Sequence, residues 1–278
     1  MKAVLSLSVI TLNLAFWLAP ILVLALVKWA IPALRARADE GLEAIYRIAV
    51  RIDDAWLKGV VGLRWNALSI DLVRDENVIV LANHVSWADI LLMQSVVVRN
   101  GPVLKFLAKR ELIFIPIFGA IFWAFDFPIL RRRTRGTELD VDRRRRDLDA
   151  IKDACRVLTI RPAALVNFAE GTRSTEEKRR DRSSPYTHLL EPRVGGFSAL
   201  LEALDEQSVR ILDLTLKYSE PQSFWSFLAG EIALIEIDSA VIDPSEVPKT
   251  RETKAAWLAD RWAIKDQQIE AFARRPRA

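Results

Sequence analysis

The sequence predicts an α/β fold, with a mixed, largely parallel sheet flanked by helices and an N-terminal membrane-anchoring helical segment in front of it. From Val78 onward, short apolar runs of strand length alternate with stretches in which apolar residues recur at helical spacing. Such alternation is typical of parallel or mixed sheets covered by helices. Before them, the segment from Ala3 to Val27 contains no charged side chain. It is longer than the about 20 residues that cross a hydrocarbon layer.

The uncharged segment predicts a retained membrane anchor over residues 1–35. A cleavable signal peptide would normally have an apolar region of about 7–15 residues, much shorter than this one. More cationic residues follow the segment than precede it. This asymmetry predicts that the bulk of the chain lies on the cytoplasmic side of an inner (cytoplasmic) membrane. Pro20 and Pro32 leave a tilted, kinked or half-inserted hairpin open as an alternative to a straight span.

Residues 36–278 are predicted to form one domain, because this length suffices for a single core. An amphipathic helix is expected from about Asp39 to Gly59 and another from about Thr253 to Phe272. Strands are expected near residues 78–83, 103–108, 126–130, 163–169, 209–218 and 231–242, and helices near residues 88–98, 138–160 and 196–205.

The amino-acid composition indicates a protein that associates with a membrane. Hydrophobic residues make up 51% of the chain and there are nine tryptophans, a combination richer in interface-seeking residues than an average soluble domain. The apolar stretch Leu112–Phe125 is too short to span, and a buried helix and a membrane-dipping surface are both open for it. The single cysteine, Cys155, cannot form an internal disulfide and is expected in the core.

Charge is distributed unevenly along the chain. Arginines dominate residues 131–146, which predicts an anionic partner on that side: a phosphorylated substrate, anionic lipid head groups or nucleic acid. The adjoining apolar segments favour the lipid options. The acidic residues interleaved among these arginines argue against nucleic acid, and a solvated charged helix start remains an alternative.

The most informative motif is the segment Asn83–Asp89, which directly follows the apolar run Val78–Ala82. Imidazole titrates near neutral pH, and a carboxylate bound to its other nitrogen fixes the tautomer and stabilises the imidazolium. His84 and Asp89 therefore suggest activation of an alcohol. Alternatively, His84 caps the following helix and Asp89 faces solvent.

A second motif, Glu170–Arg173, follows the apolar run Ala164–Phe168. Loops beyond the carboxyl ends of strands are where open α/β sheets place their ligands. Gly171 lets the backbone approach a bound group, the Thr172 hydroxyl can donate a hydrogen bond, and the Arg173 guanidinium can clamp phosphate. Glu170 could position Arg173 or a substrate hydroxyl. A turn with a structural Glu/Arg pair is the alternative.

Two looser motifs complete the set. Phe127–Arg132 predicts a short strand that carries an arginine at its end, either Arg131 or Arg132. The turn Leu190–Arg193 leads through two glycines into a helix, where backbone amides could receive an anion.

The order of these four motifs resembles the four successive blocks of the glycerolipid acyltransferases of the lysophosphatidate acyltransferase type. The similarity covers roughly residues 75–220, and the first and third blocks match well. The fourth block departs from a two-proline pattern, since it contains Pro192 alone. The residues of these motifs are most similar to those of the bacterial and eukaryotic branch that includes lysocardiolipin acyltransferases.

The resemblance implies an O-acyltransferase of phospholipid biosynthesis in which His84 takes the proton from a lysophospholipid hydroxyl and Asp89 holds the imidazole. The acyl donor would be acyl-CoA or acyl carrier protein, and the acceptor a lysophospholipid such as lysophosphatidate. No metal or tightly bound cofactor is implied. The residues expected to bind the substrate phosphate and glycerol oxygens are Arg131, Glu170, Gly171, Thr172 and Arg173.

Other functions fit less well. A serine hydrolase using Ser86 with His84 lacks the Gly-x-Ser-x-Gly elbow, and a metal hydrolase would have few ligands besides carboxylates. The second histidine, His188, stands in a polar loop and is expected to face solvent. A catalytically inactive membrane-anchored lipid-binding or scaffold protein of the same fold is the alternative from another class; both strong motifs are intact here.

Overall fold

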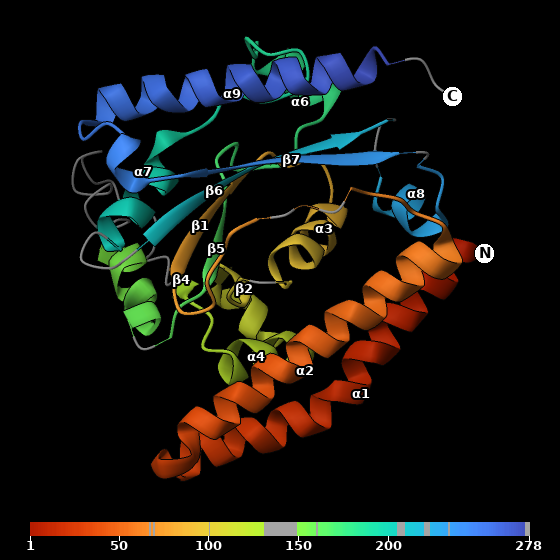
Figure 1. Ribbon diagram of the computed structural model, residues 1–278, viewed down its shortest axis with the longest axis vertical. Helices are drawn as coiled ribbons and strands as arrows, with labels where there is room; N and C mark the ends of the chain where they lie inside the picture. The colour runs from red at the N-terminus through yellow and green to blue at the C-terminus, as the bar shows by residue number, and fades with distance from the viewer. Residues whose placement is uncertain are drawn as a thin grey trace.

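The protein is built on a five-stranded sheet of order β2-β5-β1-β6-β7 (Figure 1). The computed structural model describes residues 1–66, 68, 70–99, 101–130, 149–159, 161–204, 209–219, 223–232 and 234–275. The strands are β1 (Asn77–Ala82), β2 (Leu104–Phe106), β5 (Ala164–Phe168), β6 (Val209–Tyr218) and β7 (Ile235–Ile242). The first four in sheet order run parallel, and β7 runs antiparallel to β6. The predicted mixed, largely parallel sheet is confirmed.

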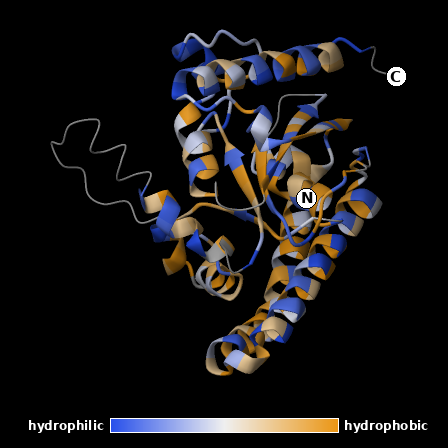
Figure 2. Cartoon of the chain, turned by 60° about the vertical axis from the view of Figure 1, so that its left-hand side comes forward, coloured by the Kyte–Doolittle hydropathy of each residue, from blue (hydrophilic) through white to orange (hydrophobic). Residues whose placement is uncertain are grey.

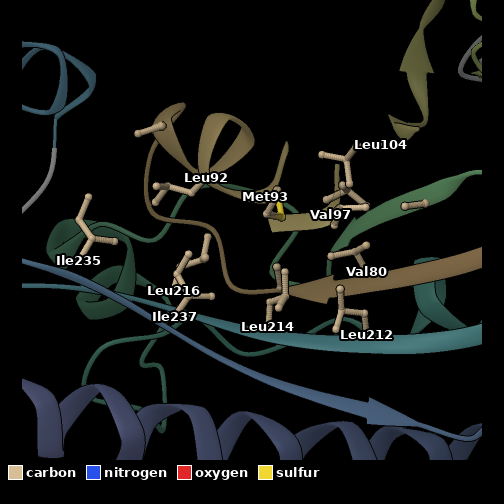
Figure 3. Packing of buried hydrophobic residues seen from close by; sticks show 14 of the residues in the cluster. Val80, Leu92, Met93, Val97, Leu104, Leu212, Leu214, Leu216, Ile235 and Ile237 are labelled. Carbon is tan, nitrogen blue, oxygen red and sulfur yellow. The ribbon is translucent and has the colours of Figure 1, made fainter. Parts of the chain in front are cut away.

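Helices cover both faces of this sheet. Alternate side chains of β1 enter two different cores, because successive strand residues point to opposite faces. Val78 and Val80 pack with α3 (Ala88–Val97) and α8 (Phe224–Ala229). Figure 3 shows Val80 near Leu92, Met93 and Val97 of α3. Ile79 and Leu81 pack with α7 (Val194–Ala203) and α9 (Arg251–Ala273) on the other face. Since every residue of β1 is buried, this strand is the centre of the fold.

The N-terminal segment forms a hairpin. Helix α1 (Lys2–Ala30) continues through Pro20, and a 3₁₀ turn (Pro32–Leu34) leads into α2 (Arg35–Trp56). A π-helical turn (Leu57–Val61) follows. The hairpin extends away from the sheet (Figures 1 and 2). The described residues contain one helix, α1, that is long and apolar enough to cross a membrane by length and composition.

The stretch 112–125 divides between a 3₁₀ turn (Arg110–Phe114) and α4 (Pro116–Ala124). Phe122 and Phe125 are buried, whereas Phe114, Phe118 and Trp123 are exposed. Burial therefore accounts for only part of this apolar stretch.

Two predicted strands differ from the structure. The run 103–108 is divided between β2 and β3 (Ala108–Lys109), and the run 126–130 contributes only β4 (Ile129–Leu130). The reason is that β2 pairs with β5, while β3 leaves that sheet and pairs with β4 in a second one.

The remaining elements are short or partly described. The predicted helix 138–160 is described from residue 149; it is helical through residue 155 and ends in a 3₁₀ turn (Arg156–Thr159). Cys155 is buried, as expected. Helix α6 (Glu176–Asp181) follows the second motif, and a 3₁₀ turn (Pro244–Glu246) precedes α9.

Candidate active site

Two predicted site segments meet at one edge of the sheet. Strands β1 and β5 are parallel neighbours, with Ala82 opposite Phe168 in the register. Their carboxyl ends therefore lie side by side. His84 follows β1 by two residues and Glu170 follows β5 by two residues. Parallel pairing thus brings together motifs that are far apart in the chain.

His84 and Asp89 form a hydrogen-bonded pair. His84 Nδ1 lies 2.8 Å from Asp89 Oδ2. Because a carboxylate can only accept, we assign the proton to Nδ1, which leaves Nε2 with a lone pair. The same Oδ2 accepts from the backbone N–H groups of Val85 at 2.7 Å and Ser86 at 2.9 Å. Asp89 is fully buried, which rules out the alternative in which it faces solvent.

The ring of His84 is held on one face and at one nitrogen. The imidazole stacks on the Phe168 ring, with centroids 3.9 Å apart and planes inclined by 15°. Its side chain keeps 15% exposure. Nε2 has no hydrogen-bond partner among the described residues. Phe168 and Asp89 thus fix the ring from its face and from one nitrogen, and leave the other nitrogen open.

Asp89 has a further partner that the sequence analysis did not identify. The hydroxyl of Tyr218, the last residue of β6, donates to Asp89 Oδ1. Burial and the negative charge of Asp89 raise the pKa of Tyr218 well above its ordinary value, so the phenol stays protonated. The available signal was its place at the end of the predicted strand 209–218, since β6 runs parallel to β1 and ends at the same edge.

Glu170 is fully buried. Its carboxylate oxygens accept from the backbone N–H groups of His84 and Leu190, each at 3.1 Å. Burial raises the pKa of Glu170 to about 8. In this geometry Glu170 holds the loops after β1 and before α7 together. Its side chain is not paired with Arg173, which lies over the ring of Trp87 with Cζ 5.4 Å from the centroid.

The three residues after Glu170 lie wholly or partly at the surface. Gly171 has a φ of +70°, a conformation that favours glycine. Thr172 Oγ1 accepts from Lys178 Nζ at 2.9 Å. Gly171 and Arg173 are exposed and Thr172 is half-buried. The other predicted substrate-binding arginine, Arg131, lies outside the described residues, as does the alternative Arg132.

His188 does not simply face solvent, so that expectation was wrong. Its Nε2 lies 2.7 Å from Glu270 Oε2, and its backbone N–H donates to Asp266 at 2.7 Å. Both carboxylates belong to α9. The loop is polar because it packs on the charged face of this distant helix, a contact that local sequence does not show.

Comparison with known proteins decides the family. A family model described as acyltransferase matches residues 67–217, more than half of the chain. The chain belongs to the acyltransferase family. This confirms the resemblance inferred from the motifs and the enzyme class.

Curated relatives of this acyltransferase include three that illustrate the range. The mouse (Mus musculus) 1-acyl-sn-glycerol-3-phosphate acyltransferase epsilon is 27% identical, with 91% of this chain and 74% of the relative covered. Arabidopsis thaliana 1-acyl-sn-glycerol-3-phosphate acyltransferase 3 is 27% identical (83% and 62% covered). Lysocardiolipin acyltransferase 1 of Danio rerio is 24% identical (78% and 58% covered). The acyltransferase chain thus spans between 58% and 74% of the length of these three.

A solved structure shares the fold. The 1-acyl-sn-glycerophosphate (LPA) acyltransferase PlsC from Thermotoga maritima aligns with a TM-score of 0.56 at 17% identity, and all of both chains is covered. At this identity the likeness supports the fold of the acyltransferase.

Proposed function

We propose that this acyltransferase moves a fatty acyl group from a thioester, acyl-CoA or acyl carrier protein, to a free hydroxyl of a lysophospholipid such as lysophosphatidate, with His84 as general base. The observation that carries the proposal is the His84–Asp89 pair, with Nδ1 held at 2.8 Å and Nε2 open. The names of the relatives, 1-acyl-sn-glycerol-3-phosphate acyltransferases, support the acceptor.

The chemistry follows from this geometry. His84 Nε2 accepts the proton of the acceptor hydroxyl as its oxygen attacks the thioester carbonyl carbon. The tetrahedral intermediate collapses, the C–S bond breaks, and the departing sulfur takes the proton back from the imidazolium. The products are an ester and a free thiol. Asp89 stabilises the imidazolium that forms in between, so no acyl-enzyme is required.

The second motif supplies the phosphate contacts in this proposal. Gly171, Thr172 and Arg173 follow β5 at the same sheet edge as His84, and the Arg173 side chain is exposed. Its guanidinium would form charge-assisted hydrogen bonds to the phosphate, together with Arg131. Glu170 would support these contacts by holding the loop, since both of its oxygens bind backbone amides.

We further propose that residues 1–35 attach the enzyme to the inner membrane, with the catalytic domain 36–278 on the cytoplasmic side. In the most apolar 18-residue window of α1, only 11% is buried. The inner face of α1 binds α2 through polar contacts: Asn13 donates to Ala49 O at 2.9 Å, and Lys28 pairs with Asp39 at 2.9 Å.

The neighbouring helix favours partial insertion of α1 over a straight crossing. Helix α2 runs beside α1 and carries exposed charged residues, among them Arg37 and Arg51. A straight crossing by α1 would draw these charges into hydrocarbon, at a cost of several kcal/mol by the estimates for a charged residue at the bilayer centre. Lying in the interface, α1 buries its apolar side in lipid while α2 stays in contact with water.

The experiment that tests the proposed reaction is acyl transfer by the purified, detergent-solubilised enzyme. Labelled acyl-CoA and acyl carrier protein are offered with a panel of lysophospholipids to wild type, His84→Ala and His188→Ala. The second variant is a matched control, because His188 also binds a carboxylate but on α9. His84→Ala should lose on the order of 10²–10⁴ in rate, whereas His188→Ala should stay active. If folded wild type acts on no acceptor, a lipid-binding or scaffold role replaces the proposal.

A further inference from the structure

The buried carboxylate of Asp89 is held from two sides. Oδ2 accepts three hydrogen bonds, from the His84 ring and from the backbone N–H groups of Val85 and Ser86. Oδ1 accepts from the hydroxyl of Tyr218. Among the described residues, Tyr218 is the one hydrogen-bond partner of Oδ1. Because Asp89 is fully buried, no solvent replaces this donor.

The position of Tyr218 is fixed by the sheet rather than by the active-site loops. Tyr218 ends β6, which pairs with β1 on one side and β7 on the other. Asn83 ties the end of this strand to the loop that carries His84, since its side chain binds both backbone groups of Leu216, at 3.0 and 2.8 Å. The phenol therefore approaches Asp89 from a rigid element, which is what a positioning contact needs.

We propose that Tyr218 is a positioning residue for acyl transfer: its hydroxyl orients the Asp89 carboxylate so that Oδ2 faces His84 Nδ1, and it moderates the negative charge that Asp89 presents to the imidazole. The inference rests on the proposed function of His84 as the general base. Tyr218 acts through Asp89 and needs no contact with the substrate.

The expected consequence of losing this hydroxyl has a definite sign. Without Tyr218, the charge of Asp89 concentrates on Oδ2 and binds a protonated His84 more strongly, so the imidazole holds its proton to higher pH. The orphaned Oδ1 also disfavours the ionised form of Asp89. Both effects shift the acid limb of kcat/KM to higher pH. Among the described residues, Glu170 and, behind it, Lys265 also act electrostatically on this carboxylate network, and neither is altered.

The test compares Tyr218→Phe with Tyr46→Phe in the same acyl-transfer assay. Tyr46 is a matched control, because its hydroxyl is also buried but lies beside Leu104 and Gln94 rather than at the Asp89 carboxylate. Tyr218→Phe should lower kcat by roughly tenfold, the effect of one hydrogen bond to a charged group. KM for donor and acceptor should stay within about twofold of wild type. The acid limb of the kcat/KM profile should shift to higher pH. Tyr46→Phe should leave kcat and the pH profile unchanged.

A second substitution distinguishes loss of the hydrogen bond from loss of folding. Placing 3-fluorotyrosine at position 218 keeps the ring and the hydroxyl and strengthens the donor, so the acid limb should move to lower pH, opposite to Tyr218→Phe. Unaltered kcat and pH profiles in both variants would overturn the inference, and so would equal shifts in the same direction. If His84→Ala kept its activity, the proposed function itself would be refuted. If His84→Ala were inactive while Tyr218→Phe behaved like wild type, only the inference about Tyr218 would be refuted.

Discussion

Asn83→Ala should destabilise the protein far more than Asn66→Ala, although the two amides make the same pair of hydrogen bonds. Asn83 binds the backbone N–H and C=O of Leu216 at 2.8 and 3.0 Å. Asn66 binds the backbone N–H and C=O of Ile237, both at 2.8 Å. Asn83 is fully buried, whereas Asn66 is exposed. The comparison therefore isolates the access of water to otherwise equal contacts.

The magnitude follows from the place of Leu216 in the sheet. The β1–β6 ladder ends at the pair Ala82 and Leu214, so the groups of Leu216 that face β1 depend on the Asn83 side chain. Leaving a buried donor and a buried acceptor unsatisfied costs about 1–3 kcal/mol each. Asn83→Ala should therefore lower the free energy of unfolding by about 2–6 kcal/mol, a large part of the usual total of about 5–15 kcal/mol. Asn66→Ala should cost about 1 kcal/mol, since water can bind the freed groups of Ile237.

Urea unfolding at fixed detergent concentration, followed by tryptophan fluorescence, measures both losses, because the chain has nine tryptophans. Acyl transfer is measured beside it, since Asn83 precedes His84 and its partner strand carries Tyr218. Asn83→Ala should also lower kcat, whereas Asn66→Ala should not. Equal losses of stability in the two variants would refute the argument from burial.

Two further predictions concern the second motif. Burial raises the pKa of Glu170 from 4.5 to about 8, so the stability that this group contributes is present below pH 4.5 and is lost as pH rises toward 8. The urea midpoint of wild type should fall between pH 5.5 and pH 8, and Glu170→Gln should show a smaller fall; identical pH slopes would contradict this. Gly171→Ala should lower the free energy of unfolding by about 1 kcal/mol, because φ is +70°. The added Cβ meets only Arg193, at ordinary contact distance. The strained turn should also raise KM for the lysophospholipid. Gly59→Ala is the control, since its added Cβ meets no atom within 4 Å, and a KM that rises equally in both variants would count against the Gly171 argument.

The central strands β1 and β5 and the two strongest motifs could be predicted because their signals are local. A buried strand such as β1 needs consecutive apolar residues, and a loop after it needs polar or flexible ones, so Val78–Ala82 and the residues from Asn83 onward mark their own boundary. The same reasoning located Glu170–Arg173 after β5. The roles of individual members of these motifs were less accessible. Glu170 binds two backbone amides, one of them 20 residues further along the chain.

By itself, the sequence determined the α/β class and the apolar N-terminal helix, and it indicated the pairing of His84 with Asp89, since periodicity and short spacing are properties of neighbours in the chain. Only the tertiary structure decided that Tyr218 reaches Asp89, that α9 holds His188, and that α1 folds back along α2. These contacts join residues dozens of positions apart. They depend on strand order and helix packing, which are set by the burial of many side chains together. Strand order and helix packing therefore cannot be predicted from the sequence of any one segment.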